Sequence, residues 1–351
     1  MKHRILRTAA AWVAAAVLFS VPANAEPSIS ARSAILLDGT TGRVLWENRA
    51  HERALIASTT KIMTGLLIAE NCSLNTKVRI PKQAVGIEGS SLDLKTGEVL
   101  CVETLLYGMM LHSGNDAAAA LALFHSGSIE AFAEAMNQRA KELGLAQTHY
   151  ANPHGLDDDQ NYSTAFDLAV LTACAMENPV FHRVVSSKNA CLEGRSFTNH
   201  NKLLWQYDGA VGVKTGYTKS AGRILVSCAE RCGRRLIAVT LSDPNDWKDH
   251  AALLDYGFAA YEEKRLVENG WSCAEVPVIG GAEETAEVVT ASGFSYALRP
   301  DEQVHFRAAL PQFVYGPVLA GDPAGELLIL LEDKEIGRVP LIWRFSVMED
   351  G

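Results

Sequence analysis

The spacing of apolar residues changes twice along the chain, which predicts strands near both ends of a domain and helices between them. Ser33–Leu37 and Arg43–Trp46 are short apolar runs joined by a glycine-containing turn, a pattern typical of a β-hairpin. From Ser58 to about Glu70, apolar residues recur at helical spacing. Further helices are predicted at 104–111, 116–124, 129–143 and 164–176.

Beyond Val211 the pattern returns to strands. Short β-branched runs occupy 211–217, 223–229 and 236–242, and a last helix is predicted at 247–261. Strands at both ends imply an α/β (α+β) domain whose sheet is assembled from both ends of the domain and packs against helices. From about Lys264 no helical period remains, and strand-like runs occur at 304–310 and 327–331. We therefore expect one domain over 26–264 and a small β-rich domain over 265–351.

The first 25 residues have the pattern of a signal peptide. Lys2, Arg4 and Arg7 precede an apolar run from Ala9 to Val21, and Ala23-Asn24-Ala25 is an A-x-A cleavage site. The run of about 13 residues is shorter than the roughly 20 that a membrane-spanning helix needs. We expect an exported protein that acts outside the cytoplasmic membrane, with no clear membrane anchor in the mature chain.

The charge and the cysteines narrow the function further. Removal of the three signal cations takes the formal charge from −9 to −12, and such an acidic chain offers no surface for nucleic acid. Seven cysteines in an exported protein suggest disulfides with one cysteine left over, and their connectivity stays open. Cys228–Cys232 and Cys72–Cys101 are the two pairings that we expect. A zinc site at Cys228-x-x-x-Cys232 is the alternative, but no second Cys or His pair follows it.

Ser58-Thr59-Thr60-Lys61 is the strongest candidate for chemistry. A serine hydroxyl becomes a good nucleophile only when a neighbouring base accepts its proton. Residues three apart on a helix share a face, so Lys61 can reach the oxygen of Ser58. Unpaired N–H groups at a helix start also suit a developing oxyanion. An N-capping serine followed by a solvated lysine is the alternative interpretation of this tetrapeptide alone.

Two further motifs favour the catalytic interpretation. Ser113-Gly114-Asn115 lies in the predicted break between two helices, and Lys214-Thr215-Gly216 lies on a predicted strand. S-x-x-K, S-D-N and K-T-G together are typical of penicillin-binding proteins and class A β-lactamases. A second K-T-G at Lys95-Thr96-Gly97 lies in a predicted turn instead.

From Ile29 to Tyr261 the chain resembles the low-molecular-mass penicillin-binding proteins, which are serine-type D-alanyl-D-alanine carboxypeptidases. The sequence segments around the three motifs show this resemblance, and so do Asn152-Pro153-His154-Gly155-Leu156 and the segment 163–169. The resemblance implies a penicillin-binding/β-lactamase-like domain with an antiparallel sheet and helices. Residues 265–351 resemble the β-rich C-terminal domain of that family only loosely.

The resemblance implies roles for individual residues. Ser58 would attack the carbonyl between two terminal D-alanines of a peptidoglycan stem peptide, with Lys61 as base and Ser113 as proton relay to the leaving amine. The resemblance also implies covalent inhibition by β-lactams, and no metal or cofactor is expected. The substrate-binding roles that it implies fall on Asn115, Lys214, Thr215, Gly216 and Tyr217, where Lys214 and Thr215 would hold the terminal carboxylate.

Other functions use related residues. A β-lactamase of class A would need an E-x-x-x-N arrangement between the second and third motifs, and none occurs between Asn115 and Lys214. A transpeptidase or endopeptidase would use the same three motifs. A wall-binding domain without activity would not need them, and a Ser-His-Asp triad with His154 and Asp167 is disfavoured because Lys61 can serve as base.

Overall fold

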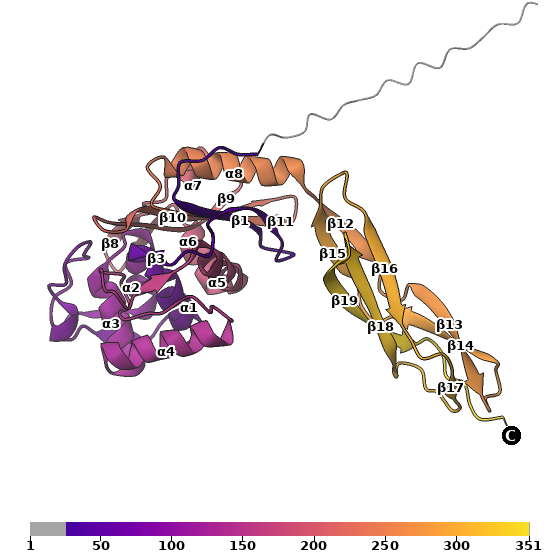
Figure 1. The fold of residues 1–351 in the computed structure, drawn as a ribbon. Coiled ribbons are helices and arrows are strands. Elements are labelled where there is room, and N and C mark those ends of the chain that lie inside the picture. Colours follow the sequence, from indigo (N-terminus) through magenta and orange to yellow (C-terminus); the bar gives the residue numbers. More distant parts are fainter. Residues whose placement is uncertain (1–25, 351) are drawn as a thin grey trace, which may run out of the picture.

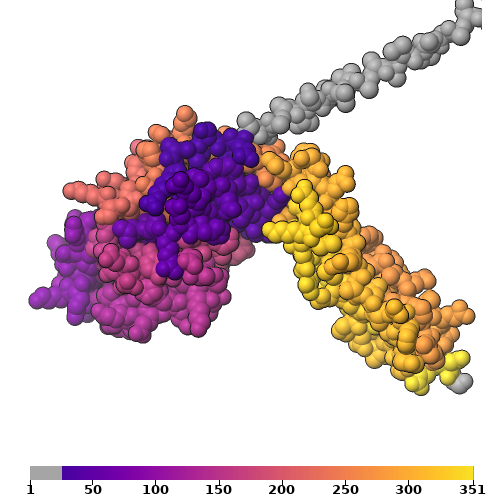
Figure 2. Space-filling model, viewed as in Figure 1, coloured from indigo at the N-terminus to yellow at the C-terminus, as the bar shows by residue number. Residues whose placement is uncertain are grey.

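We describe residues 26–350 in a computed structural model of the chain; the predicted signal peptide lies outside the described residues. These residues form two bodies (Figure 1), an α/β body followed by an elongated β-rich body that projects from one side of it (Figure 2). No helix within residues 26–350 is both long enough and apolar enough to cross a membrane.

A central antiparallel sheet organises the first body. Its strand order is β2-β1-β11-β10-β9. Because β1 pairs with both β2 and β11, strands from the two ends of this body lie side by side, as the sequence predicts. Strands β2 and β9 form its two edges. The bounds are β1 Ser33–Asp38, β2 Val44–Asn48, β9 Ala210–Thr218, β10 Gly222–Arg231 and β11 Arg234–Leu241.

Helices cover both faces of this sheet. Successive side chains of a strand point to opposite faces, so Ile35 packs into the core shared with most of the helices, whereas Leu36 packs with α8. Figure 1 shows α8 on one face and the other long helices on the other. The bounds are α1 Lys61–Asn71, α2 Val102–Leu111, α3 Asn115–Ser126, α4 Ile129–Glu142, α5 Ala165–Glu177, α6 Pro179–Ser186, α7 Leu203–Gln206 and α8 Asp246–Ala260.

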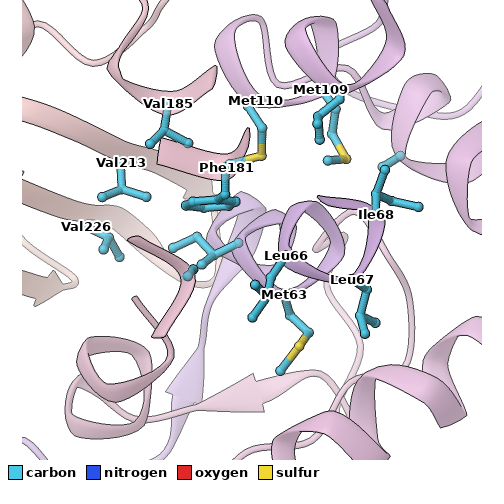
Figure 3. Packing of buried hydrophobic residues seen from close by; sticks show 14 of the residues in the cluster. Met63, Leu66, Leu67, Ile68, Met109, Met110, Phe181, Val185, Val213 and Val226 are labelled. Carbon is cyan, nitrogen blue, oxygen red and sulfur yellow. The ribbon is translucent and has the colours of Figure 1, made fainter. Parts of the chain in front are cut away.

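Helix α1 is the central element of the helical layer. All of its residues from Lys61 to Ile68 are buried, as expected of a helix surrounded by other elements. Figure 3 shows Met63 and Leu66 of α1 in the same core as Phe181 of α6, Val213 of β9 and Val226 of β10. This packing fixes the start of α1 against the edge of the sheet.

Shorter elements connect these layers. The 3₁₀ turns are η1 Ala57–Thr60 and η2 Lys82–Ala84; the short strands are β3 Ala54–Leu55, β4 Lys77–Arg79, β5 Val99–Cys101, β6 Tyr162–Ser163, β7 Asn189–Leu192 and β8 Arg195–Thr198. The α6 helix and the β7–β8 hairpin were not predicted from the sequence. Asn178 caps α6 by accepting hydrogen bonds from Val180 N (2.9 Å) and Phe181 N (3.1 Å), and Pro179 is its first residue.

The second body begins directly after α8 and contains strands only. A six-stranded sheet has the order β16-β18-β19-β14-β13-β17, and β12 pairs with β15. Its core includes Val288, Ile329, Leu341 and Trp343. The bounds are β12 Glu262–Val267, β13 Ser272–Ile279, β14 Thr285–Thr290, β15 Phe294–Leu298, β16 Val304–Ala309, β17 Val314–Tyr315, β18 Pro323–Leu331 and β19 Lys334–Trp343.

One arginine links the two bodies. Arg43 Nη1 donates to Ala297 O (2.5 Å) and to Glu302 (2.7 Å), while its guanidinium lies 4.9 Å from the ring centre of Tyr261 and 5.3 Å from that of Tyr296. The Arg43 and Glu302 side chains are only 12% and 13% exposed. This largely buried pair holds the second body against β2.

The expected disulfides are wrong, because all seven cysteines are free thiols. Cys228 points into the core from β10, whereas Cys232 is exposed in the turn after that strand. Four residues of extended chain span roughly 13 Å, far beyond the Cα separation that a disulfide allows. Cys72 follows α1 and Cys101 ends β5, and their thiols are not joined.

Candidate active site

Ser58 lies in the 3₁₀ turn η1, immediately before α1. The sequence predicted an α-helix from Ser58, whereas the α-helix begins at Lys61. The preceding residue, Ala57, has a φ of 44°, in the left-handed region that non-glycine residues rarely adopt. The tight turn at Ala57 therefore sets the orientation of the Ser58 side chain at the start of the helix.

Lys61 is fully buried beneath Ser58. Its Nζ atom is hydrogen-bonded to Ser58 Oγ (3.0 Å), to Asn115 Oδ1 (2.7 Å) and to the backbone oxygen of His154 (2.6 Å). Burial, reinforced by the charge of Lys214, lowers the pKa of Lys61 well below its ordinary value, against the opposing influence of Asp116. The structure thus provides an amine that can lose its proton and touches the hydroxyl it would activate.

Ser113 and Asn115 lie where α2 ends and α3 begins, as predicted. Ser113 has a φ of 65°, again in the left-handed region, and it lines a cavity together with Ser58. Asn115 uses both ends of its amide, because Oδ1 accepts from Lys61 and Nδ2 donates to Glu88 O (2.6 Å). A Cβ at Gly89 would lie 2.8 Å from Asn115 Nδ2, so the loop needs glycine there. Because both ends of its amide are hydrogen-bonded, the Asn115 side chain is held in place and can position Lys61.

The edge strand β9 brings the third motif to the same place. A Cβ on Gly216 would lie 3.2 Å from both Ser58 N and Ala57 Cβ, so the strand passes close to η1. Tyr217 is 65% exposed, whereas Lys214 is buried and its Nζ donates to Thr215 O (2.9 Å). Burial lowers the pKa of Lys214 to about 7.

These residues surround a cavity of about 350 Å³, lined among others by Ser58, Ser113, Thr215, Gly216 and Tyr217. Lys61, Asn115 and Lys214 are buried and are not among its lining residues. A larger cavity of about 710 Å³ lies near α5 and the β10–β11 hairpin. None of the predicted site residues lines this larger cavity, so we take the smaller cavity as the candidate active site.

The loop Asn152–Gly155 contributes a group that the sequence did not identify. The backbone oxygen of His154 holds Lys61, and Pro153 O accepts from Thr64 Oγ1 (2.7 Å). A Cβ at Gly155, whose φ is 88°, would lie 1.9 Å from Ala57 O, so only glycine fits. The sequence segment 152–156 contributed to the family resemblance, but it gave no indication that the backbone carbonyl of His154 would contact Lys61.

Two alternatives weighed from the sequence, a Ser-His-Asp triad and a catalytic role for the second K-T-G, find no support in the geometry. Asp167 accepts hydrogen bonds from Gln147 N (2.9 Å) and Thr148 Oγ1 (2.7 Å) rather than from His154. Lys95 and Gly97 of the second K-T-G lie in a turn before β5, outside the cavity lining. Within residues 26–350, no cluster of three or more His, Cys, Asp or Glu is arranged to hold a metal ion.

Comparisons with known proteins agree with this geometry. The profile of the peptidase S11 family, described as D-alanyl-D-alanine carboxypeptidase, matches residues 20–245. The D-alanyl-D-alanine carboxypeptidase DacF of Bacillus subtilis is 32% identical over 93% of this chain and 88% of its own length. DacC of Escherichia coli, which carries the same description, is 33% identical over 99% of this chain and 93% of its own length.

Solved structures show the same relationship. Penicillin-binding protein 5 of Haemophilus influenzae aligns with a TM-score of 0.80 and 29% identity, covering 93% of this chain and 99% of its own. A point mutant of the Streptomyces K15 DD-transpeptidase aligns with a TM-score of 0.63 and 34% identity, covering 67% of this chain and 100% of its own. The predicted fold class, the penicillin-binding-protein resemblance and the enzyme class are confirmed. The chain belongs to the peptidase S11 family, the serine-type D-alanyl-D-alanine carboxypeptidases that include penicillin-binding proteins.

Proposed function

We propose that Ser58 is the nucleophile of this carboxypeptidase and that Lys61 is its general base. The observation that carries the proposal is the contact of 3.0 Å between Lys61 Nζ and Ser58 Oγ at a fully buried amine. A neutral lysine has two N–H groups and one lone pair. Asn115 Oδ1 and His154 O accept the two N–H groups, which directs the lone pair toward the Ser58 hydroxyl.

The reaction then proceeds through an acyl-enzyme. As Ser58 Oγ attacks the carbonyl carbon of the penultimate residue, its proton passes to Lys61. Ser113, which lines the same cavity, relays a proton to the departing amine, and the C–N bond breaks to release the terminal amino acid. Water attacks the ester in a second step and restores the serine.

The oxyanion of the intermediate would be stabilised by backbone N–H groups of Ser58 and Tyr217. Two observations support this. Strand β9 is the edge of the sheet, so its outer N–H groups are not used by another strand. The strand also approaches Ser58 N at Gly216, where a Cβ would be only 3.2 Å away.

The proposed substrate is a peptidoglycan stem peptide that ends in D-Ala-D-Ala, and β-lactams would be covalent inhibitors of the same serine. Lys214 and Thr215 would bind the terminal carboxylate, with Gly216 leaving space for an extended substrate backbone and Asn115 holding Lys61. We also propose that the chain is exported, as its first 25 residues indicate.

The test uses Ser58→Ala. Mass spectrometry of the wild type after incubation with a fluorescent penicillin should show one covalent adduct on the peptide that contains Ser58. The variant should show neither adduct nor release of D-alanine from a D-Ala-D-Ala peptide. A labelled Ser58→Ala protein would mean that another residue is the nucleophile.

Transpeptidation is the second candidate, because a similar Streptomyces K15 structure is described as a DD-transpeptidase. The two activities differ only in whether water or an amine attacks the acyl-enzyme. Product analysis with a D-Ala-D-Ala peptide plus an amine acceptor separates them. Free D-alanine with a shortened peptide indicates hydrolysis, whereas a peptide joined to the acceptor indicates transpeptidation.

A further inference from the structure

Three segments of the second body meet at its end farthest from the first body, where Figure 1 places β17. They are residues 279–285, 311–323 and 344–350. The end of β13 pairs with β17, and Val318 exchanges two backbone hydrogen bonds with Val347 (2.9 and 3.0 Å). Backbone hydrogen bonds therefore hold these segments together.

Large apolar side chains are exposed on all three segments. We call them the tip surface, and each is between 46% and 69% exposed: Ile279, Phe313, Tyr315, Leu319, Phe345 and Met348. They make up half of the exposed large apolar side chains in residues 26–350. The rings of Phe313 and Tyr315 meet edge to face, with their centres 5.6 Å apart. A single exposed apolar residue is ordinary, whereas a group of this kind marks an interaction site.

The rim of the tip surface is acidic. The three segments carry five exposed carboxylates: Glu283, Glu284, Asp322, Glu349 and Asp350. Their only basic residue is Arg344, and its Nη1 already donates to Glu287 (2.8 Å), which lies outside the three segments. Charges of one sign on a surface favour a partner of the opposite sign. The tip surface therefore fits an apolar partner that also carries lysine or arginine.

The same charges disfavour two other occupants. A two-fold contact with a second copy of the chain would place the acidic rim against itself, since both subunits use the same patch. An anionic bilayer would likewise repel the five carboxylates. A basic partner protein is the occupant that both the apolar centre and the acidic rim favour.

Strand β17 indicates the form of that partner. It is an edge strand of the six-stranded sheet and pairs with β13 on one side. The other side of an edge strand has backbone N–H and C=O groups to which an added extended segment can hydrogen-bond. Phe313 and Tyr315 are two residues apart, so they point to one face and can contact every second residue of such a segment.

We propose that the tip surface docks an extended segment of a partner protein in which apolar residues alternate with lysine or arginine. The apolar residues cover Phe313 and Tyr315, and the basic residues face carboxylates of the rim such as Glu283 and Glu284. This docking is separate from the chemistry at Ser58. The elongated second body then acts as a spacer between the partner and the catalytic body.

Fluorescence anisotropy with the full chain and short labelled peptides tests the docking. One peptide alternates leucine with lysine, and its counterpart alternates leucine with glutamate. The protein should bind the lysine peptide with a Kd below about 1 mM and the glutamate peptide at least about tenfold more weakly. The affinity for the lysine peptide should fall as salt rises, because the carboxylates of the rim are exposed.

Replacing both Phe313 and Tyr315 by serine should weaken binding of the lysine peptide by about tenfold or more, since aromatic anchors dominate interfaces. The matched control replaces Trp271 and Phe306 by serine. These rings also meet edge to face, with centres 5.5 Å apart, and are 43% and 41% exposed. Trp271 precedes β13, whereas the tip surface lies at the far end of that strand, so the control should bind as the wild type does. Unchanged melting temperatures show that the variants are folded.

A second variant tests the rim and does not depend on the aromatic one. Glu283→Gln combined with Glu284→Gln removes two charges and should weaken binding by about two- to tenfold. Its control is Glu332→Gln combined with Asp333→Asn, in the turn at the end of β18 opposite the tip surface. That control should change binding by less than about twofold.

Three results with the peptides would overturn the proposal: no binding of the lysine peptide, equal binding of both peptides, or equal losses in the variants and their controls. Two further results would overturn it by identifying another occupant. Binding to phosphatidylglycerol vesicles that the Phe313 and Tyr315 substitutions abolish would indicate a membrane surface. Self-association in sedimentation that these substitutions abolish would indicate a second copy of the chain. None of these measurements depends on acyl-enzyme formation.

Discussion

The side-chain oxygen of Asn115 accepts a hydrogen bond of 2.7 Å from Lys61 Nζ, although the two residues are 54 positions apart in the chain. Helix α3 presents Asn115 at its first position, and α1 presents Lys61 at its own first position. The neutral amide oxygen orients the lysine without adding a negative charge. A lysine in this place can lose its proton more easily than one beside a carboxylate.

Replacing that oxygen by a charged one should therefore impair the base. In Asn115→Asp, a carboxylate beside Lys61 would raise the pKa of the lysine by about 1–3 units and reduce acylation near neutral pH by about ten- to a thousand-fold. Acylation should recover toward alkaline pH. The pH profile of acylation by a β-lactam checks this, with Asn137→Asp on α4 as a control that places a carboxylate outside the cavity.

Lys61→Arg should keep a positive charge beneath Ser58 and yet lose acylation. A guanidinium does not give up its proton near neutral pH, and general-base catalysis typically contributes about 10²–10⁴-fold. The measurement is the rate of covalent labelling by a fluorescent penicillin, alongside the melting temperature. Near-normal labelling would show that Lys61 acts only as a fixed charge.

Lys214→Met should change the pH dependence of acylation. The charge of Lys214 helps to lower the pKa of Lys61, so its removal should raise that pKa. Because the neutral amine is the active base, the acidic limb should then move to higher pH, by about one unit. The substrate for this measurement should be a D-Ala-D-Ala peptide with an amidated C-terminus. Such a peptide has no terminal carboxylate for Lys214 to bind, so a change in its acylation does not report on carboxylate binding. A limb that stays in place or moves to lower pH would contradict the prediction.

Arg43→Ala should loosen the contact between the two bodies without altering catalysis. The variant leaves Glu302 without its cation at a largely buried position, at a cost of about 3–5 kcal/mol. We expect faster proteolysis near residues 260–264 and a lower melting temperature, with unchanged acylation. Arg338→Ala is the control, because its pair with Glu326 is 53% exposed on both sides and is therefore screened by solvent. Equal effects of the two variants would show that Arg43 is not a link between the bodies.

The sequence predicted the main elements of the first body because their periodicities are long and regular. Strand β9 and helix α3 were placed within a few residues of their bounds, and so was the break that holds Ser113. The α6 helix was missed although Asn178-Pro179 is a recognisable start, since its eight residues give too short a pattern to stand out. The domain limits at 264 and 265 remain a prediction, while the change from helix to strand falls between Ala260 and Glu262.

Side-chain motifs predicted most of the candidate site, but contacts made by the backbone were beyond the sequence. The oxygen of His154 has no signature, since every residue carries a carbonyl. The pairing of Arg223 with Asp246, which both line the candidate cavity, depends on β10 lying beside the start of α8, which one sequence does not reveal. The expected disulfides were wrong because the number of cysteines indicates only whether a protein's compartment favours disulfides. It does not indicate which thiols lie close together.

The left-handed backbone at Ala57 and Ser113 has a consequence for laboratory evolution of this enzyme. Conformations of this kind cost about 1–3 kcal/mol each in residues other than glycine. Variants chosen only for resistance to heat would therefore tend to acquire glycine or a relaxed turn at these two positions. Ala57 adjoins the proposed nucleophile and Ser113 is the proposed proton relay, so such a lineage would gain thermal tolerance while turnover declined.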